Sequence, residues 1–156
     1  MNQPKTRHFP AHAGLILACL VFQSLAGPVM AQQMVEAGNF EIHYNTFNTS
    51  LLTPEVARAY EIQRSGNRAL LNIAVLEPAA EGLNRPVSAR VTASATNLAG
   101  QRRVIDMREI RDQDAIYYIG TFRIHNDESL NFTIEVRPEG GGRPHEFSFR
   151  QQFFTD

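Results

Sequence analysis

Beyond residue 40, the chain repeats one pattern: a short run of alternating apolar and polar residues, followed by a turn signal. Alternation with a period of two is typical of β-strands that bury one face. About seven segments show it: Phe40–Asn45, Arg68–Glu77, Val87–Thr96, Arg103–Ile110, Ala115–Ile124, Leu130–Arg137 and a last segment with Phe147, Phe149, Gln151 and Phe153 on one side. The pattern therefore predicts an all-β domain.

The alternation also indicates how the strands are arranged. Antiparallel strands with one solvated face alternate in this way, whereas parallel strands are apolar throughout. Arg68–Glu77 is the exception: it is apolar on both faces, so we expect it at the centre of a sheet that is covered on both sides. Short strands at this spacing indicate an immunoglobulin-like antiparallel β-sandwich of about seven strands, with a small barrel as the alternative. The Cys…Trp…Cys signature of immunoglobulin domains is absent, since the chain contains no tryptophan.

One helical signal lies between the first two of these segments. Thr53 can cap a helix, Pro54 suits the first helical position, and Glu55 places an acid in the first turn. We therefore expect one short helix that continues to Tyr60.

The first thirty-one residues follow a different pattern. Lys5 and Arg7 precede an apolar run from Leu15 to Phe22, and the sequence VMA at 29–31 resembles the end of a secretory signal. The run is shorter than the ~20 apolar residues of a membrane-spanning helix. We expect a signal peptide at 1–31 that is cleaved after Ala31.

Cleavage at that point leaves one domain, residues 32–156, in the periplasm and with no membrane span. The alternative is a lipoprotein attached through Cys19, the only cysteine of the chain. A product without Cys19 has no disulfide and no thiolate chemistry. Removing Lys5 and Arg7 from the fifteen basic residues leaves thirteen arginines against sixteen acidic residues, a net charge of −3. No basic cluster has the character of a nucleic-acid surface.

Three histidines remain after cleavage: His43, His125 and His145. Together with Met107, they are candidate ligands for copper or zinc. No two of these histidines have the i, i+2 or i+4 spacing of a local site, so a metal site requires all three to meet in space. We expect no cofactor, and metal binding is kept as the alternative function.

Catalytic motifs are absent from the sequence. Ser65 and Ser148 lack the Gly-x-Ser-x-Gly turn of a hydrolase nucleophile. Asp112 and Asp114 flank a turn, where aspartate commonly hydrogen-bonds the backbone. We therefore expect a protein that is not an enzyme. A hydrolase whose site the sequence does not reveal is a further alternative.

Polar side chains gather around the predicted turns, where loops on a rigid scaffold often carry function. They either bond the loops to the sandwich or form a recognition surface at one end of it. The candidate binding residues are Asn45, Asn48, Asn67, Arg68, Asn97, Gln101, Arg108 and Tyr117.

The same segments resemble DUF4426, a family of short exported bacterial proteins defined as a domain of unknown function. The matching stretches are His43–Thr49, Pro54–Ser65, Asn67–Asn72, Ala95–Gln101, Arg108–Arg111, Asp114–Ile119 and Gln152–Thr155. They follow one another over essentially the whole mature chain. The resemblance implies a single exported domain from a Gram-negative bacterium, located in the periplasm, and it implies no activity, ligand or catalytic residue.

Export, the sandwich pattern and the lack of a catalytic motif favour a periplasmic, non-enzymatic binding or assembly module. Such a module would dock another envelope protein through one end of the sandwich or through an edge strand.

Overall fold

The computed structural model of the chain describes residues 33–80, 84–139 and 143–155. The expected signal peptide at 1–31, its cleavage point after Ala31 and Cys19 lie outside the described residues.

The described residues form ten strands, one 3-10 helix and one α-helix. The strands are β1 (Gln33–Ala37), β2 (Phe40–Asn48), β3 (Arg68–Glu77), β4 (Arg85–Pro86), β5 (Ala89–Asn97), β6 (Arg102–Ile105), β7 (Arg108–Asp112), β8 (Ala115–Arg123), β9 (Glu128–Pro138) and β10 (His145–Phe153). The helices are η1 (Thr49–Leu51) and α1 (Pro54–Ala59).

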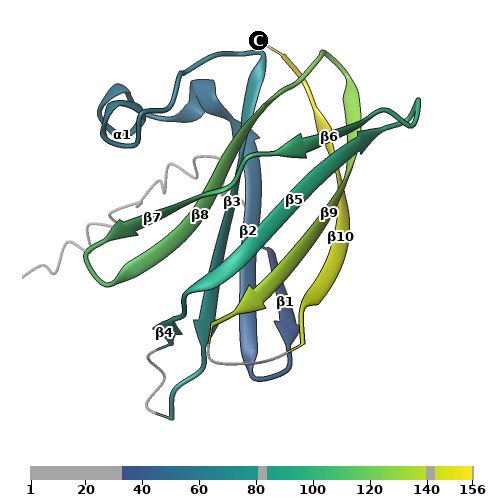
Figure 1. Cartoon of the computed structure of the whole chain (residues 1–156). Coiled ribbons are helices and arrows are strands. Elements are labelled where there is room, and N and C mark those ends of the chain that lie inside the picture. Colours follow the sequence, from purple (N-terminus) through teal and green to yellow (C-terminus); the bar gives the residue numbers. More distant parts are fainter. Residues whose placement is uncertain (1–32, 81–83, 140–142, 156) are drawn as a thin grey trace, which may run out of the picture.

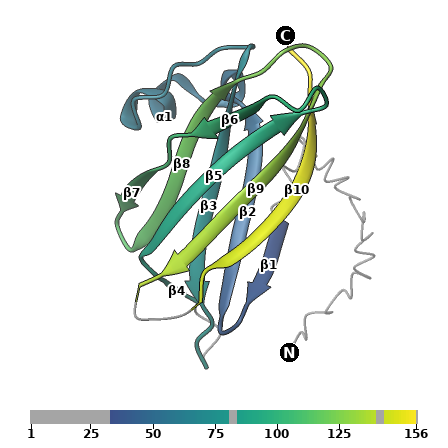
Figure 2. The same cartoon turned by 45° about the vertical axis from the view of Figure 1, so that its right-hand side comes forward.

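Two antiparallel sheets pack face to face (Figures 1 and 2). The larger sheet has the order β1-β2-β3-β8-β7, and β4 pairs with the end of β3 beyond β8. The smaller sheet has the order β10-β9-β5-β6. β1 and β10 lie along one open side of the sandwich, and β6 and β7 lie along the other (Figure 2). The predicted antiparallel β-sandwich with one short helix is confirmed.

The structure has three strands more than the predicted seven, two with weak patterns and one from a predicted segment that divides. In β1 only Ala37 is buried, so alternation hardly shows. This strand forms a hairpin with β2 through Gly38, whose φ of 66° suits glycine. β4 has only two residues. The third additional strand comes from the predicted segment Arg103–Ile110, which the structure divides.

The inward faces of the strands make one core. Leu71 and Ile73 of β3 are fully buried, as is Ile134 of β9. Phe132 of β9 stacks on Phe149 of β10, with ring centroids 4.7 Å apart. Burying a side chain of this size is worth roughly 1.5–3 kcal/mol relative to leaving it exposed. These contacts hold the two sheets together.

β3 is apolar on both faces, as predicted. Its outward residue Leu70 forms a second small cluster with Ile62 and Ile119, on the side of the larger sheet that faces away from the core. The predicted helix covers this side (Figure 1). Thr53 caps it by accepting a hydrogen bond from the Val56 amide at 3.3 Å, and Pro54 is its first residue.

The prediction of one strand over Arg103–Ile110 is wrong. β6 belongs to the smaller sheet and β7 to the larger, so the chain changes sheets at Asp106-Met107. Gly120 of β8 lies directly beneath this crossover. A Cβ atom placed on Gly120 would lie 2.6 Å from Cγ2 of Ile105 and 2.7 Å from the Asp106 carbonyl oxygen. Only glycine lets the crossover pass this close to β8.

A polar contact ties the sheets together next to the crossover. The Tyr118 hydroxyl on β8 accepts a hydrogen bond from the Ala89 amide on β5 at 2.6 Å and donates to Oε2 of Glu109 at 3.0 Å. Burial, followed by the hydrogen bond to Glu109, raises the pKa of Tyr118 to about 12. The hydrogen bond to Glu109 therefore depends on the protonated phenol.

Replacing Gly120 with alanine should lower the free energy of unfolding by about 1–3 kcal/mol, because the added methyl group overpacks the crossover. Urea denaturation measures the change. Ser148→Ala on the exposed face of β10 is the control, with an expected effect within about 0.5 kcal/mol. A Gly120→Ala protein as stable as the control would show that the crossover can move away from β8.

Tyr118→Phe should be less stable than the native protein near neutral pH, because the buried Ala89 amide loses its acceptor. The folded-state pKa of Tyr118 lies above its ordinary value of 10, so its contribution is complete below about pH 10 and is lost as the pH rises through about 12. The stability difference between the two proteins should therefore shrink across that window. Urea denaturation at a series of pH values tests this, and a constant difference would contradict it.

Candidate functional site

A groove lies between α1 and the outward face of the larger sheet. Its cavity volume is about 340 Å³. We call it the outer-face groove, and its lining residues are Phe47, Leu52, Val56, Tyr60, Ile62, Leu70, Asn72, Ile110, Asp112, Tyr117 and Ile119. Most of these side chains are apolar or aromatic, and few are polar, which is the usual composition of a binding site.

The floor of the groove follows from strand pairing. Leu70 and Asn72 are alternate residues of β3, so they share one face of the sheet, and Asn72 lies opposite Ile119 of β8. Tyr117 of β8 lies opposite Ile110 of β7. Three neighbouring strands therefore contribute side chains to one continuous floor.

The segment that carries α1 is anchored at its ends. The Thr49 hydroxyl, which is fully buried, donates to the Ser65 carbonyl at 3.2 Å and accepts from the Ser65 amide at 3.0 Å. The Arg64 guanidinium donates to the Ser50 carbonyl at 3.0 Å. These bonds close the loop that contains α1 and fix its position over the sheet.

α1 also contacts β7 across the groove. The Tyr60 hydroxyl donates to Oδ2 of Asp112 at 2.8 Å, and this hydrogen bond is the main cause that raises the pKa of Tyr60. Nη2 of Arg108 donates to the Tyr60 carbonyl. Ala57 is the buried residue of α1, so the helix makes little apolar contact with the sheet. The polar bonds of Tyr60 at its C-terminal end hold the helix above the groove.

A polar hollow of about 400 Å³ adjoins the groove and shares Ile62 and Ile119 with it. Arg68 and Arg108 line this hollow, together with the carboxylates of Glu61 and Asp106. The outward face thus offers an apolar cavity beside a charged one.

The structure separates the predicted polar residues into three groups. Asn45, Arg108 and Tyr117 lie on the outward face, and Oδ1 of Asn45 is buried without a hydrogen-bond partner within the described part of the chain. Arg108 lines the polar hollow, and Tyr117 lines the groove. Arg68, described next, also lines the polar hollow, whereas Asn45 lines neither cavity.

The second group supports the strand ends close to the C-terminus (Figure 1). Asn48 donates to the Phe154 carbonyl at 2.7 Å, and Arg68 donates to the Thr121 hydroxyl at 3.1 Å. Asn67 accepts a hydrogen bond from the Ser65 hydroxyl at 2.7 Å.

The third group closes the β5–β6 turn. Asn97 donates to Oε1 of Gln101 at 2.8 Å and accepts from the Gln101 amide at 2.9 Å. The side chains of Asn97 and Gln101 therefore hydrogen-bond within the turn that they form.

The candidate metal ligands lie on different parts of the sandwich. His43 of β2 contacts Glu41 at 3.0 Å, His125 follows β8, and His145 begins β10 beside Gly38. Met107 packs against the core at the crossover. Within 33–80, 84–139 and 143–155, no group of three or more histidine, cysteine or acidic residues is placed to hold a metal ion.

The sequence did not single out the apolar lining as a site. Two features of the sequence could have indicated this lining. They are the second apolar face of Arg68–Glu77 and the short helix predicted before that segment. An apolar outward face predicts a cover, but not that the cover leaves a cavity around Asn72.

Known proteins share this architecture. The family described as "Domain of unknown function (DUF4426)" matches residues 34–156. The crystal structure of a DUF4426 family protein from Pseudomonas aeruginosa PAO1 is similar with 35% identity and a TM-score of 0.70, over 80% of this chain and 96% of that chain. No curated protein matches the chain.

More distant likeness extends to FetP of uropathogenic Escherichia coli strain F11. One FetP structure has 9% identity and a TM-score of 0.56, over 80% of this chain and 95% of that chain. A copper-bound FetP variant has 9% identity and a TM-score of 0.54, over 80% and 96%. At this identity the likeness concerns the fold alone. Among the described residues, no helix has the length and apolar character to cross a membrane.

Thr49→Val should loosen the loop that carries α1, because the Ser65 amide loses its acceptor and the Ser65 carbonyl keeps only the Arg68 amide as a donor. The expected loss in the free energy of unfolding is about 1–3 kcal/mol. Amide hydrogen exchange should show faster exchange in residues 49–65 than elsewhere. Thr133→Val is the control, since its hydroxyl makes only a 3.5 Å contact with Ser148 on the exposed face. Unchanged exchange in residues 49–65 of Thr49→Val would contradict the anchoring role.

Proposed function

The chain belongs to the DUF4426 family, and we propose that it is a non-enzymatic binding module that docks another protein of the bacterial envelope through the outer-face groove. The observation that carries the proposal is an apolar cavity on the outward face of a sheet. In a half-exposed antiparallel sheet that face is normally polar.

The size of the groove favours one anchoring side chain. A cavity of about 340 Å³ lies at the lower end of the roughly 300–1,000 Å³ of small-molecule sites. It suits a single large apolar group. Protein interfaces concentrate their binding energy in such buried apolar or aromatic anchors, surrounded by a polar rim.

The apolar surface extends beyond the cavity. Val56 lines the groove and is 39% exposed. Leu51, next in the chain to Leu52 of the groove, is 62% exposed. A small ligand held inside the groove leaves these side chains in water, whereas a protein surface laid over α1 covers them. Exposed apolar groups next to a cavity are typical of a protein-binding surface.

The polar groups of the groove fit recognition better than catalysis. Asp112 already accepts the hydrogen bond of Tyr60. The amide of Asn72 and the hydroxyl of Tyr117 remain in the lining, where they can orient a partner by hydrogen bonding. The groove therefore offers one apolar contact with two neutral polar groups beside it.

The periplasmic location is part of the same proposal. The basic start, short apolar run and VMA sequence at 29–31 support export of the chain.

Site-specific photo-crosslinking in the envelope of the native bacterium tests the docking surface. A benzoylphenylalanine placed at Val56 should give a discrete adduct with a partner protein. The same group at Val104, which is 78% exposed on β6, should not give that adduct. Both positions expose a valine, so they differ mainly in their distance from the groove.

Competition shows whether the adduct depends on the groove. Excess purified native protein should suppress it at least about 10-fold, and Val104→Arg protein should act equally well. Val56→Arg protein should fail, because a guanidinium would lie at the mouth of an apolar cavity. Equal adducts from Val56 and Val104, or full competition by Val56→Arg, would rule out docking at the groove.

A further inference from the structure

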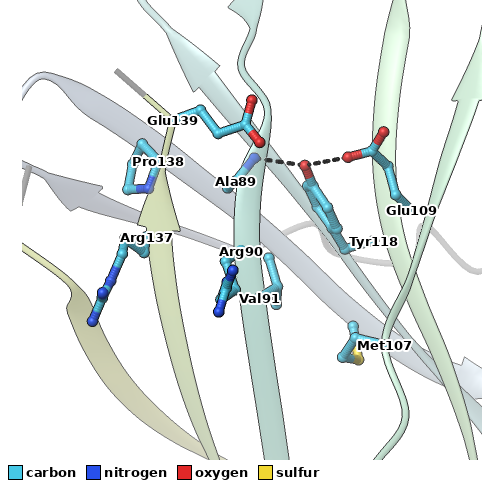
Figure 3. A pocket seen from close by; sticks show the side chains of 9 residues that line it. All are labelled: Ala89, Arg90, Val91, Met107, Glu109, Tyr118, Arg137, Pro138 and Glu139. Atoms are coloured by element: carbon cyan, nitrogen blue, oxygen red, sulfur yellow. Dashed lines mark hydrogen bonds between the residues drawn. The ribbon is translucent and has the colours of Figure 1, made fainter. Parts of the chain in front are cut away.

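A third opening lies next to the β6–β7 crossover, between β5 of the smaller sheet and β7 and β8 of the larger one (Figure 3). Its volume is about 650 Å³. We call it the edge slot. Arg90 and Val91 of β5 line one wall, and Met107, Glu109 and Tyr118 line the other.

The edge slot exists because β6 leaves β5 early. β6 pairs with residues 93–96 of β5, and the chain then crosses to the larger sheet at Asp106-Met107. β9 pairs with β5 along its full length, from Ala89 to Asn97, on the opposite side. Among the described strands, none pairs with residues 89–92 on the β6 side.

The backbone of Val91 points into this opening. On β5, the Asn97 amide donates to the Gln101 carbonyl on the β6 side, whereas the Ser88 carbonyl accepts from Glu139 on the β9 side. The backbone N–H and C=O groups of successive residues in an antiparallel strand point to opposite neighbours. Those of the odd-numbered residues of β5 therefore point to the β6 side. The Ala89 amide is already bound to Tyr118. Within the described residues, the Val91 amide and carbonyl and the Ala89 carbonyl therefore have no strand partner on this side.

Unpaired strand groups determine what can fill the edge slot. An extended peptide supplies the matching donors and acceptors at strand spacing, which a compact small molecule does not. Four residues of extended chain span about 13 Å. Edge strands that are not meant to pair usually carry a proline, a bulge or an inward charge. Here the inward residue is Val91, and Met107 packs against the core behind it.

The positive charge on the outward side of β5 favours acidic residues in the bound peptide. Arg90 and Arg137 lie directly opposite each other on β5 and β9. Arg137 has a weak ion pair with Glu135 at 3.9 Å, and Arg90 has no ion pair within the described residues. Two adjacent guanidinium groups repel each other, and a carboxylate from an added strand would offset this.

We propose that the edge slot binds an extended segment of a partner protein as an added antiparallel strand on β5, with apolar residues toward Val91 and Met107 and acidic residues toward Arg90. This site is separate from the outer-face groove. Residues that pair with Val91 share its inward side, so the apolar residues of the segment direct their amides at β5, and the acidic residues direct theirs away.

Short labelled peptides that alternate valine, isoleucine or phenylalanine with glutamate are the probe, and fluorescence anisotropy with the folded domain measures their binding. Saturable binding is expected below about 1 mM. N-methylation of the apolar residues should abolish it, whereas N-methylation of the glutamates should leave it unchanged. Equal losses from the two methylated sets, or no binding at all, would overturn the proposal.

Two variants test the same edge from the protein side. Val91→Pro removes the amide that faces the edge slot while leaving the β9 ladder intact, and proline is tolerated at such an edge. Arg90→Glu reverses the outward charge. Each should weaken binding of the glutamate peptides at least about 10-fold, and peptides with lysine in place of glutamate should restore binding to Arg90→Glu.

Val56→Arg, in the outer-face groove, is the matched control and should bind the peptides like the native protein. Thermal unfolding and far-ultraviolet circular dichroism verify that each variant is folded. If Val91→Pro is unfolded, Arg90→Glu and the methylated peptides still test whether the edge slot binds an added strand. A dimer in sedimentation that Val91→Pro dissolves would also overturn the proposal, because the edge would then be occupied by a second copy of this chain.

Discussion

The double-sided burial of β3 is the constraint on which the rest of the structure depends. Its inward residues Leu71 and Ile73 form the middle of the core, and its outward residue Leu70 has to be covered as well. α1 supplies that cover. An all-β sandwich with one exposed face on each sheet would need no helix, so the helix and the cavity beneath it both follow from the apolar outer face of one central strand.

The α1 segment covers an apolar face, whereas the crossover between β6 and β7 leaves a strand edge unpaired within the described residues. The crossover closes part of the sandwich, and its backbone at Asp106 passes so close to Gly120 that a side chain there would not fit. Because the chain changes sheets there, neither β6 nor β7 can follow its neighbour to the end. One short connection therefore accounts for both the compact packing at Gly120 and the unpaired edge at Val91.

The sequence predicted the elements that have strict periodicity and missed those that do not. β5 and β9 alternate cleanly because one face of each meets the core. The change of sheet at Asp106-Met107 is not visible in the sequence. Ile105 and Met107, on either side of it, both pack inward, so the alternation of apolar and polar residues continues through it.

The candidate site was harder to predict, for a related reason. Residues of the groove come from β2, α1, β3, β7 and β8, and only strand order brings them together. Tyr60 and Asp112 are bonded although they are 52 positions apart. Asn97 and Gln101 attracted attention as polar turn residues, but polarity in a turn does not show whether a side chain faces a partner or, as here, its own backbone.

Strand pairing in the larger sheet also bears on how the chain reaches its native state. β3 pairs with β2 nearby, but its other neighbour is β8, and Arg68 pairs with Arg123. The β3–β8 ladder cannot form until the residues between Ile73 and Tyr118 have been synthesised. Folding is therefore governed by high contact order, which slows it. Until the smaller sheet has formed as well, the inward face of β3 stays exposed to solvent, and an exposed apolar strand favours aggregation during synthesis.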